Sequence, residues 1–242
     1  MSTSAGQGAK PGRLGAALVP AASKVRNRLL HPLAKPLLFV VALVPFFWLL
    51  SAAIFGLLGA NPAEALVRAT GDWTLRFLCI VLAVTPLRVL TGNPALARFR
   101  RMLGLFVYFY ALCHLLSYGW FDMGFDVGDI TRDIAKRPFI LVGFTAIVLL
   151  TPLALTSFNR AIRALGPKRW QMLHRLVYGV AALAILHFFW MRSGKNDFGE
   201  VAIYAAVIAA LLGWRLWKAL GRQRATRAAR AALAPHESRP TS

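Results

Sequence analysis

The sequence has few acidic residues and almost no cysteine. Only 9 Asp and Glu residues stand against 29 Lys and Arg residues, and 16% of the 242 residues are charged. The two cysteines, Cys79 and Cys113, form no CxxC pair, which argues against a disulfide framework or a zinc site. The chain also lacks a GxGxxG motif after a strand and any loop long enough for a nucleotide-binding domain. NAD(P)H would therefore reach it only through a partner or a diffusible carrier.

Long apolar runs make up most of the chain, which is 57% hydrophobic. Runs of about 20 residues are long enough to cross a bilayer core of roughly 30 Å. We therefore predict an all-α polytopic membrane protein, folded as a six-helix transmembrane bundle. The predicted spans are 37–59, 73–91, 102–120, 138–157, 171–191 and 200–218. The net charge of +20 does not indicate nucleic-acid binding, because the basic residues lie between and beyond these runs.

The connections between the spans alternate in charge. The 88–101 and 158–170 segments contain basic residues and no acidic ones, whereas 60–72 and 119–137 contain Asp or Glu. Because basic connections stay in the cytoplasm, both termini are predicted to be cytoplasmic. Three parts follow: a basic N-terminal tail at 1–36, a transmembrane domain at 37–218, and a C-terminal tail at 219–242 that is disordered apart from a short surface helix. We detect no internal repeat.

Three histidines lie inside predicted spans: His114 in the third, and His174 and His187 in the fifth. An ionisable side chain in hydrocarbon is costly, so such a residue suggests a functional site. Both spans run from inside to outside, and a rise of 1.5 Å per residue puts His114 about 12 Å and His187 about 8 Å below the outer surface. At this similar depth they could be the two axial ligands of a haem iron. Without a CxxCH motif, the haem would be of the non-covalent b type.

His174 lies roughly 20 Å deeper than His187 and, on an ideal helix, about 140° around the axis from it. Either the helix contains a π-bulge or the two histidines face different neighbours. The level of His174 suits a second redox centre, but one haem spacing before His114 the third span has Arg100 or Arg101 instead of a histidine. The alternative for all three histidines is interhelical hydrogen bonding without any haem.

Basic residues near the span ends are candidates for binding anionic cofactor groups. Arg76 would pair with an outer haem propionate, unless it only reaches to the surface. The inner rim would bind inner propionates or a flavin phosphate, unless it only sets topology. This rim comprises Arg88, Arg100, Arg101, Lys168 and Arg169. Three glycines would permit close helix approach or a flat macrocycle against the backbone: Gly104, Gly143 and Gly179.

Four segments resemble a known family. They read TPLRVLTG, RFRRMLGLFVYFYALCHLLSY, RPFILVGFTAIVLLTPLALTSFN and LGPKRWQMLHRLVYGVAALAILHFFW. The resemblance is to the MsrQ family, the haem-binding membrane subunits of bacterial methionine-sulfoxide reductase systems, within the ferric-reductase-like transmembrane superfamily. It covers roughly 37–218, and KRWQMLH and HLLSY are its most specific parts.

The resemblance implies a b-type haem protein of the bacterial inner membrane, an electron-transfer subunit rather than the catalytic one. Electrons would come from the quinone pool or a cytosolic flavin reductase and leave to a periplasmic molybdopterin-dependent methionine-sulfoxide reductase. The family's three intramembrane histidines fall on His114, His174 and His187, and FMN is implied as a further cofactor. Unlike the wider superfamily, the chain lacks a fourth histidine and a fused FAD/NAD(P)H domain. We expect the partner to dock on the 119–137 segment.

Two other functions remain open from the sequence. One is a quinol-linked cytochrome b or a metal-ion reductase that acts on small molecules. The other is a transporter or assembly factor in which the histidines move protons or metal ions. This second alternative predicts that the protein has no porphyrin spectrum.

Overall fold

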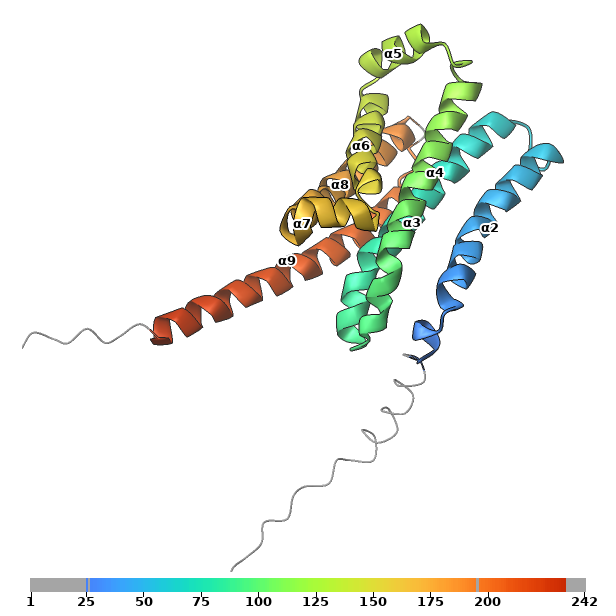
Figure 1. Cartoon of the computed structure of the whole chain (residues 1–242). Coiled ribbons are helices and arrows are strands. Elements are labelled where there is room, and N and C mark those ends of the chain that lie inside the picture. The colour runs from blue at the N-terminus through green and yellow to red at the C-terminus, as the bar shows by residue number, and fades with distance from the viewer. Residues whose placement is uncertain (1–24, 26, 195, 234–242) are drawn as a thin grey trace, which may run out of the picture.

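The computed structural model describes residues 25, 27–194 and 196–233, and this part of the chain is helical, with no strand (Figure 1). Within this part, six helices are long and apolar enough to cross a membrane, which confirms the predicted all-α bundle. They are α2 (Ala34–Ile54), α3 (Pro62–Leu90), α4 (Arg100–Phe121), α6 (Pro138–Leu155), α8 (Leu176–Ser193) and α9 (Gly199–Leu233). Three shorter helices connect them: η1 (Pro94–Phe99), α5 (Val127–Lys136) and α7 (Asn159–Leu173).

The second span begins well before the predicted residue 73. Asn61 caps α3 by accepting a hydrogen bond from the Glu64 amide at 3.2 Å, and Pro62 occupies the first helical position. Proline is favoured there, because its missing N–H would have no helical partner anyway. Hydropathy does not detect this turn, because Glu64 and Arg68 make it polar. Gly71 and Asp72, predicted to be in a loop, are therefore helical.

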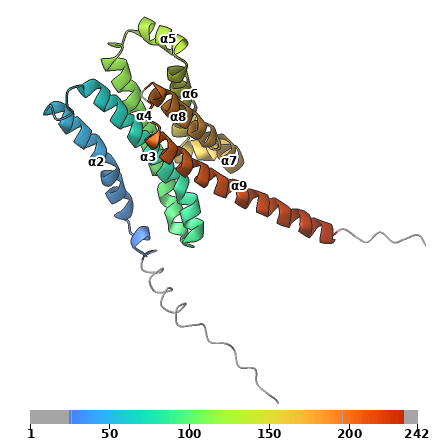
Figure 2. The ribbon, with the colours of Figure 1, turned by 180° about the vertical axis from the view of Figure 1, so that it is seen from behind.

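Two short helices lie at opposite ends of the bundle. α5 connects α4 to α6, and its N-cap Asp126 accepts a hydrogen bond from the Asp129 amide at 2.8 Å. α7 precedes α8 and is interrupted at Gly166, which has a φ of 73° before Pro167. The two views of the ribbon place α5 and α7 at the two ends of α6 and α8 (Figure 2). We call these the α5 end and the α7 end.

The bundle is built from two antiparallel helix pairs, α3 with α4 and α6 with α8, and α9 packs on α3 and α8. An aromatic cluster stabilises α2 on the first pair. Tyr110 is fully buried and stacks on Phe77 with 5.2 Å between ring centroids. The Tyr110 hydroxyl accepts a hydrogen bond from the Phe46 amide and donates one to the Ala42 carbonyl, next to the helix-interrupting Pro45.

The outward faces of the spans carry many exposed Leu, Val and Phe side chains, as expected of a protein that contacts lipid. These faces and the six apolar helices identify the chain as a multi-pass membrane protein. At its C-terminal side, α9 continues as an exposed helix over 219–229 and ends at Leu233, where the sequence predicts a mostly disordered tail. Its many Ala, Arg and Leu residues are strong helix formers, and no proline interrupts them. The predicted tail residues 1–24, 26 and 234–242 lie outside the described part.

Candidate functional site

The structure brings together the two histidines that the sequence analysis paired because of their similar depth in the membrane. His114 lies on α4 and His187 on α8, with 6.0 Å between ring centroids and 79° between ring planes. His114 Nδ1 lies 2.8 Å from the Val67 carbonyl oxygen on α3, and His187 Nδ1 lies 2.7 Å from the Phe139 carbonyl oxygen on α6. Each histidine is thus held by the partner helix of its own antiparallel pair.

These two hydrogen bonds determine which ring nitrogen is free. A carbonyl oxygen only accepts, so Nδ1 of each ring carries the hydrogen and donates it. Nε2 then keeps its lone pair, the form in which imidazole binds a metal. The 6.0 Å separation of the ring centroids matches two imidazoles on opposite sides of one metal ion, with metal–nitrogen bonds of about 2 Å.

Both imidazoles line a cavity of about 320 Å³ between α3, α4, α6 and α8, which we call the histidine cavity. Buried apolar side chains such as Leu75 and Phe188 line its middle. Arg68 and Arg137 also line it, from the first turns of α3 and just before α6. The cavity therefore combines a largely apolar lining, two imidazoles, two guanidinium groups and the carboxylates of Glu64, Asp72 and Asp122.

A small polar network anchors α5 beside this cavity. The Tyr118 hydroxyl on α4 donates a hydrogen bond to Asp133 on α5, and Arg137 donates to the same carboxylate. The Arg137 hydrogen bond is the main reason that the pKa of Asp133 lies below its ordinary value. The ionised carboxylate thus links α4, α5 and the start of α6.

His174 does not lie on the same helix as His187, so the predicted continuous span over 171–191 is wrong. α7 ends at Leu173, His174 is its C-cap, and α8 begins at Leu176. His174 Nε2 lies 3.2 Å from Thr156 Oγ1, and its ring packs on Trp170 with 4.0 Å between centroids. A helix break, and not a π-bulge, gives the two histidines different neighbours.

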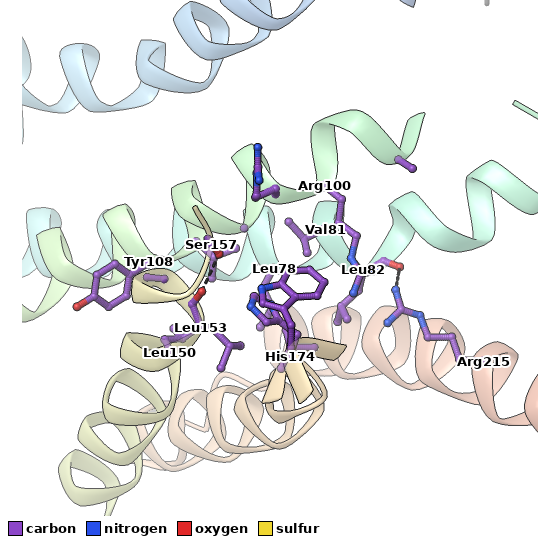
Figure 3. A pocket seen from close by; sticks show the side chains of 17 residues that line it. Leu78, Val81, Leu82, Arg100, Tyr108, Leu150, Leu153, Ser157, His174 and Arg215 are labelled. Atoms are coloured by element: carbon purple, nitrogen blue, oxygen red, sulfur yellow. Dashed lines mark hydrogen bonds between the residues drawn. The ribbon is translucent and has the colours of Figure 1, made fainter. Parts of the chain in front are cut away.

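His174 lines a second cavity of about 240 Å³ near the α7 end, which we call the arginine cavity (Figure 3). Arg100, Arg101 and Arg215 line it, together with the Trp170 ring. Arg215 donates to the Leu82 carbonyl at 2.6 Å and to the Tyr178 hydroxyl at 3.2 Å, while its buried Nε has no partner among the described residues. No Asp or Glu is among the described residues that line this cavity.

One apolar layer separates the two cavities. Leu78 on α3, Val107 on α4 and Leu150 on α6 line both of them, and their exposed fractions are 1%, 2% and 6%. The two sites are therefore neighbours along the bundle, with a single layer of side chains between them.

Of the basic residues predicted to bind anionic cofactor groups, some line a cavity and others do not. Arg100 and Arg101 line the arginine cavity, whereas Arg88, Lys168 and Arg169 are exposed and line neither cavity. Arg76 is also exposed, 4.6 Å over the Trp73 ring and 3.2 Å from the Tyr204 hydroxyl, as a side chain that reaches to the surface would be.

The sequence analysis did not select three of the arginines that line the cavities: Arg68, Arg137 and Arg215. Arg215 lies inside the predicted span 200–218, so the criterion that selected the histidines would have found it. Arg68 was assigned to a loop because the true start of α3 was not recognised.

Comparison with known proteins places the chain in a family. The model of the ferric reductase like transmembrane component matches residues 70–185. A Polaromonas naphthalenivorans protein named "protein-methionine-sulfoxide reductase heme-binding subunit MsrQ" is 71% identical over 208 residues, 86% of this chain and 95% of that protein. The proteins of the same name from Herminiimonas arsenicoxydans and Xanthomonas campestris pv. campestris are 54% and 48% identical, each covering 74% of this chain and 83% and 81% of their own lengths. No solved structure matches. The chain belongs to the MsrQ family, with the ferric-reductase-like region at its centre.

Proposed function

We propose that this chain binds a b-type haem in the histidine cavity through Nε2 of His114 and His187, and that it delivers electrons to a periplasmic methionine-sulfoxide reductase. The supporting observation is the pair of facing imidazoles, each with its Nδ1 hydrogen bonded to a backbone carbonyl. The names of the relatives supply the heme-binding role and the reductase to which such a subunit belongs.

The residues of the cavity fit this cofactor. A bound haem supplies a reversible one-electron carrier. The Val67 and Phe139 carbonyls hold the imidazoles in the ligating tautomer and make Nε2 more basic. The apolar lining keeps water away and helps to set the reduction potential. Arg68 and Arg137, which are paired with Glu64 and Asp133, would share these partners with the propionate carboxylates or exchange them.

The arginine cavity would hold the donor-side cofactor. The positive-inside rule orients the α7 end toward the cytoplasm and the α5 end toward the periplasm. Arg100 and Arg215 would bind an anionic group, and Trp170 offers a flat aromatic wall. His174 Nε2 is occupied by Thr156, so this site suits FMN better than a second haem. Leu78, Val107 and Leu150 would then be all that separates the two redox centres.

Electrons would enter at the α7 end from quinol or from a cytosolic flavin reductase. They would leave at the α5 end, where the molybdopterin-dependent partner would dock on α5. Reversing the charge of Asp126 and Asp129 tests this docking face. We expect electron delivery to the purified partner to fall while dithionite reduction of the haem stays normal. Unchanged delivery would place the docking face elsewhere.

The decisive experiment is an absorption spectrum of the detergent-purified protein, oxidised and dithionite-reduced. We expect reducible Soret and α bands, and their loss in His114→Ala and His187→Ala. His174→Ala should retain them, and so should the exposed control His31→Ala. A wild-type protein without these bands would exclude the haem function and favour a transporter or assembly factor. Reduction of ferric chelates in preference to the partner enzyme would instead favour a metal-ion reductase.

A further inference from the structure

Each paired histidine faces a glycine on the neighbouring helix. A Cβ built at Gly143 on α6 would lie 2.7 Å from His187 Nδ1, and one built at Gly71 on α3 would lie 3.2 Å from His114 Nδ1. The other two glycines that the sequence singled out differ, since a Cβ at Gly104 or Gly179 meets nothing within 4 Å. The close approach is therefore to the imidazole rings themselves.

The same register occurs in both helix pairs. His114 bonds the Val67 carbonyl and faces Gly71, four residues later; His187 bonds the Phe139 carbonyl and faces Gly143, again four residues later. In both pairs the glycine lies in the first half of the first helix, and the histidine lies in the second half of the second helix. The sequence shows no repeat, but the bundle contains this local arrangement twice.

Helix geometry explains the spacing of four. A helical carbonyl already accepts the amide of residue i+4, so a second donor must approach its remaining lone pair from the side. The Cα–Cβ bond of residue i+4 tilts toward the helix N-terminus, over that carbonyl. Glycine at this position leaves the carbonyl open. A Cβ at this position would crowd the imidazole N–H as it approaches that oxygen.

We infer that Gly71 and Gly143 are positioning residues: each, with the carbonyl one turn earlier, fixes the plane and the tautomer of one haem-ligating histidine. This inference rests on the proposed haem function and deepens it. The two positions are not equal, because a Cβ contact at 2.7 Å forces the ring to move, while one at 3.2 Å needs only a shift of a few tenths of an ångström. His187 should therefore be the more sensitive ligand.

Three alanine variants of the full-length protein in detergent test the inference. Gly143→Ala should convert most of the haem from a six-coordinate, carbon-monoxide-inert form into one that binds carbon monoxide when reduced, because an iron that loses an axial ligand gains an open position. Gly71→Ala should show a smaller effect, seen as a shifted midpoint potential and partial carbon monoxide binding. Gly179→Ala, on the same helix as His187, is the matched control and should behave as wild type.

Protein yield and elution volume separate this role from simple helix packing. Alanine is a better helix former than glycine, so the substitution itself does not weaken the helix. Folded Gly143→Ala with wild-type spectrum, potential and carbon monoxide inertness would overturn the inference. If Gly143→Ala does not fold, Gly71→Ala is judged by the same criteria. Loss of folded protein in both variants would make the glycines packing residues and would also overturn it. A wild type without haem bands would instead remove the proposed function.

Discussion

His114 and His187 face each other with their imidazole planes nearly perpendicular, at 79°. Each plane is fixed by the hydrogen bond that its Nδ1–H donates to a backbone carbonyl, that of Val67 for His114 and that of Phe139 for His187. The angle therefore follows from the two helix pairs and not from a contact between the rings. It has a spectroscopic consequence when both rings bind one iron.

Perpendicular axial imidazoles leave two iron d orbitals close in energy. We expect the oxidised protein to give the strongly anisotropic low-spin electron paramagnetic resonance signal, with its large highest g value, and not the rhombic signal of parallel planes. The measurement is a low-temperature spectrum of the ferric protein in detergent. A rhombic signal would mean that the rings turn when they bind the cofactor, which would break at least one of the two carbonyl hydrogen bonds.

His174 should behave differently from the other two histidines. Its Nε2 bonds Thr156 and its ring packs on Trp170 in the arginine cavity. We expect His174→Ala to slow haem reduction by the physiological donor about tenfold or more, the equivalent of roughly 1.4 kcal/mol. Its dithionite-reduced spectrum should match wild type. Thr156→Val, which removes only the hydroxyl contact, should have a smaller effect. Loss of the haem bands in His174→Ala would make it a ligand after all.

The sequence predicts the bundle well because the spans follow from the length of the apolar runs and the candidate histidines from the cost of an ionisable group in the membrane. Neither criterion depends on how the helices pack. Counting residues from each histidine to the charged outer end of its span paired His114 with His187 correctly. The continuous helix predicted through His174 was wrong, because the helix break beside Arg175 involves no proline or glycine and leaves hydropathy unchanged. Gly143 is likewise indistinguishable from Gly179 in the sequence. Only the position of the neighbouring imidazole separates them.

Arg215 should be required for the donor side of the reaction. Its guanidinium bonds the Leu82 carbonyl and the Tyr178 hydroxyl, and no carboxylate lines its cavity among the described residues. We expect Arg215→Met to lower the flavin content and the donor-driven reduction rate about tenfold, since a charge-assisted bond to an anion is lost. Lys218→Met, one turn further along α9, is the control. Equal effects of the two substitutions would point to loss of positive charge in general.

The anchor of α5 should depend on pH through Asp133. Because Arg137 lowers the pKa of this carboxyl in the folded protein, its stabilising effect is complete above the unfolded pKa of about 3.9 and is lost as pH falls through the lower folded value. We expect Asp133→Asn to reduce hydrogen-exchange protection in α5 at pH 7. The difference from wild type should disappear under acid conditions. Asp129→Asn, which removes an exposed pair with Arg132, should change protection much less.

Tyr110 should stabilise the attachment of α2. Its hydroxyl lies between the Phe46 amide, at 3.1 Å, and the Ala42 carbonyl, at 2.8 Å. These two groups stand four residues apart on α2, beside Pro45, and the hydroxyl gives each of them a partner on α4. We expect Tyr110→Phe to lower the free energy of unfolding by about 1 kcal/mol, measured by denaturant titration in detergent.

Tyr108→Phe is the control for this effect, because among the described residues the Tyr108 hydroxyl hydrogen bonds with the Thr151 side chain, at 3.3 Å, and with no backbone group of α2. If Tyr110→Phe were as stable as wild type, the Phe46 amide and the Ala42 carbonyl would not need the hydroxyl, and the aromatic packing would hold α2 without it. A loss near 1 kcal/mol with normal haem bands would instead show that this bond stabilises the attachment of α2 and is not needed to form the histidine cavity.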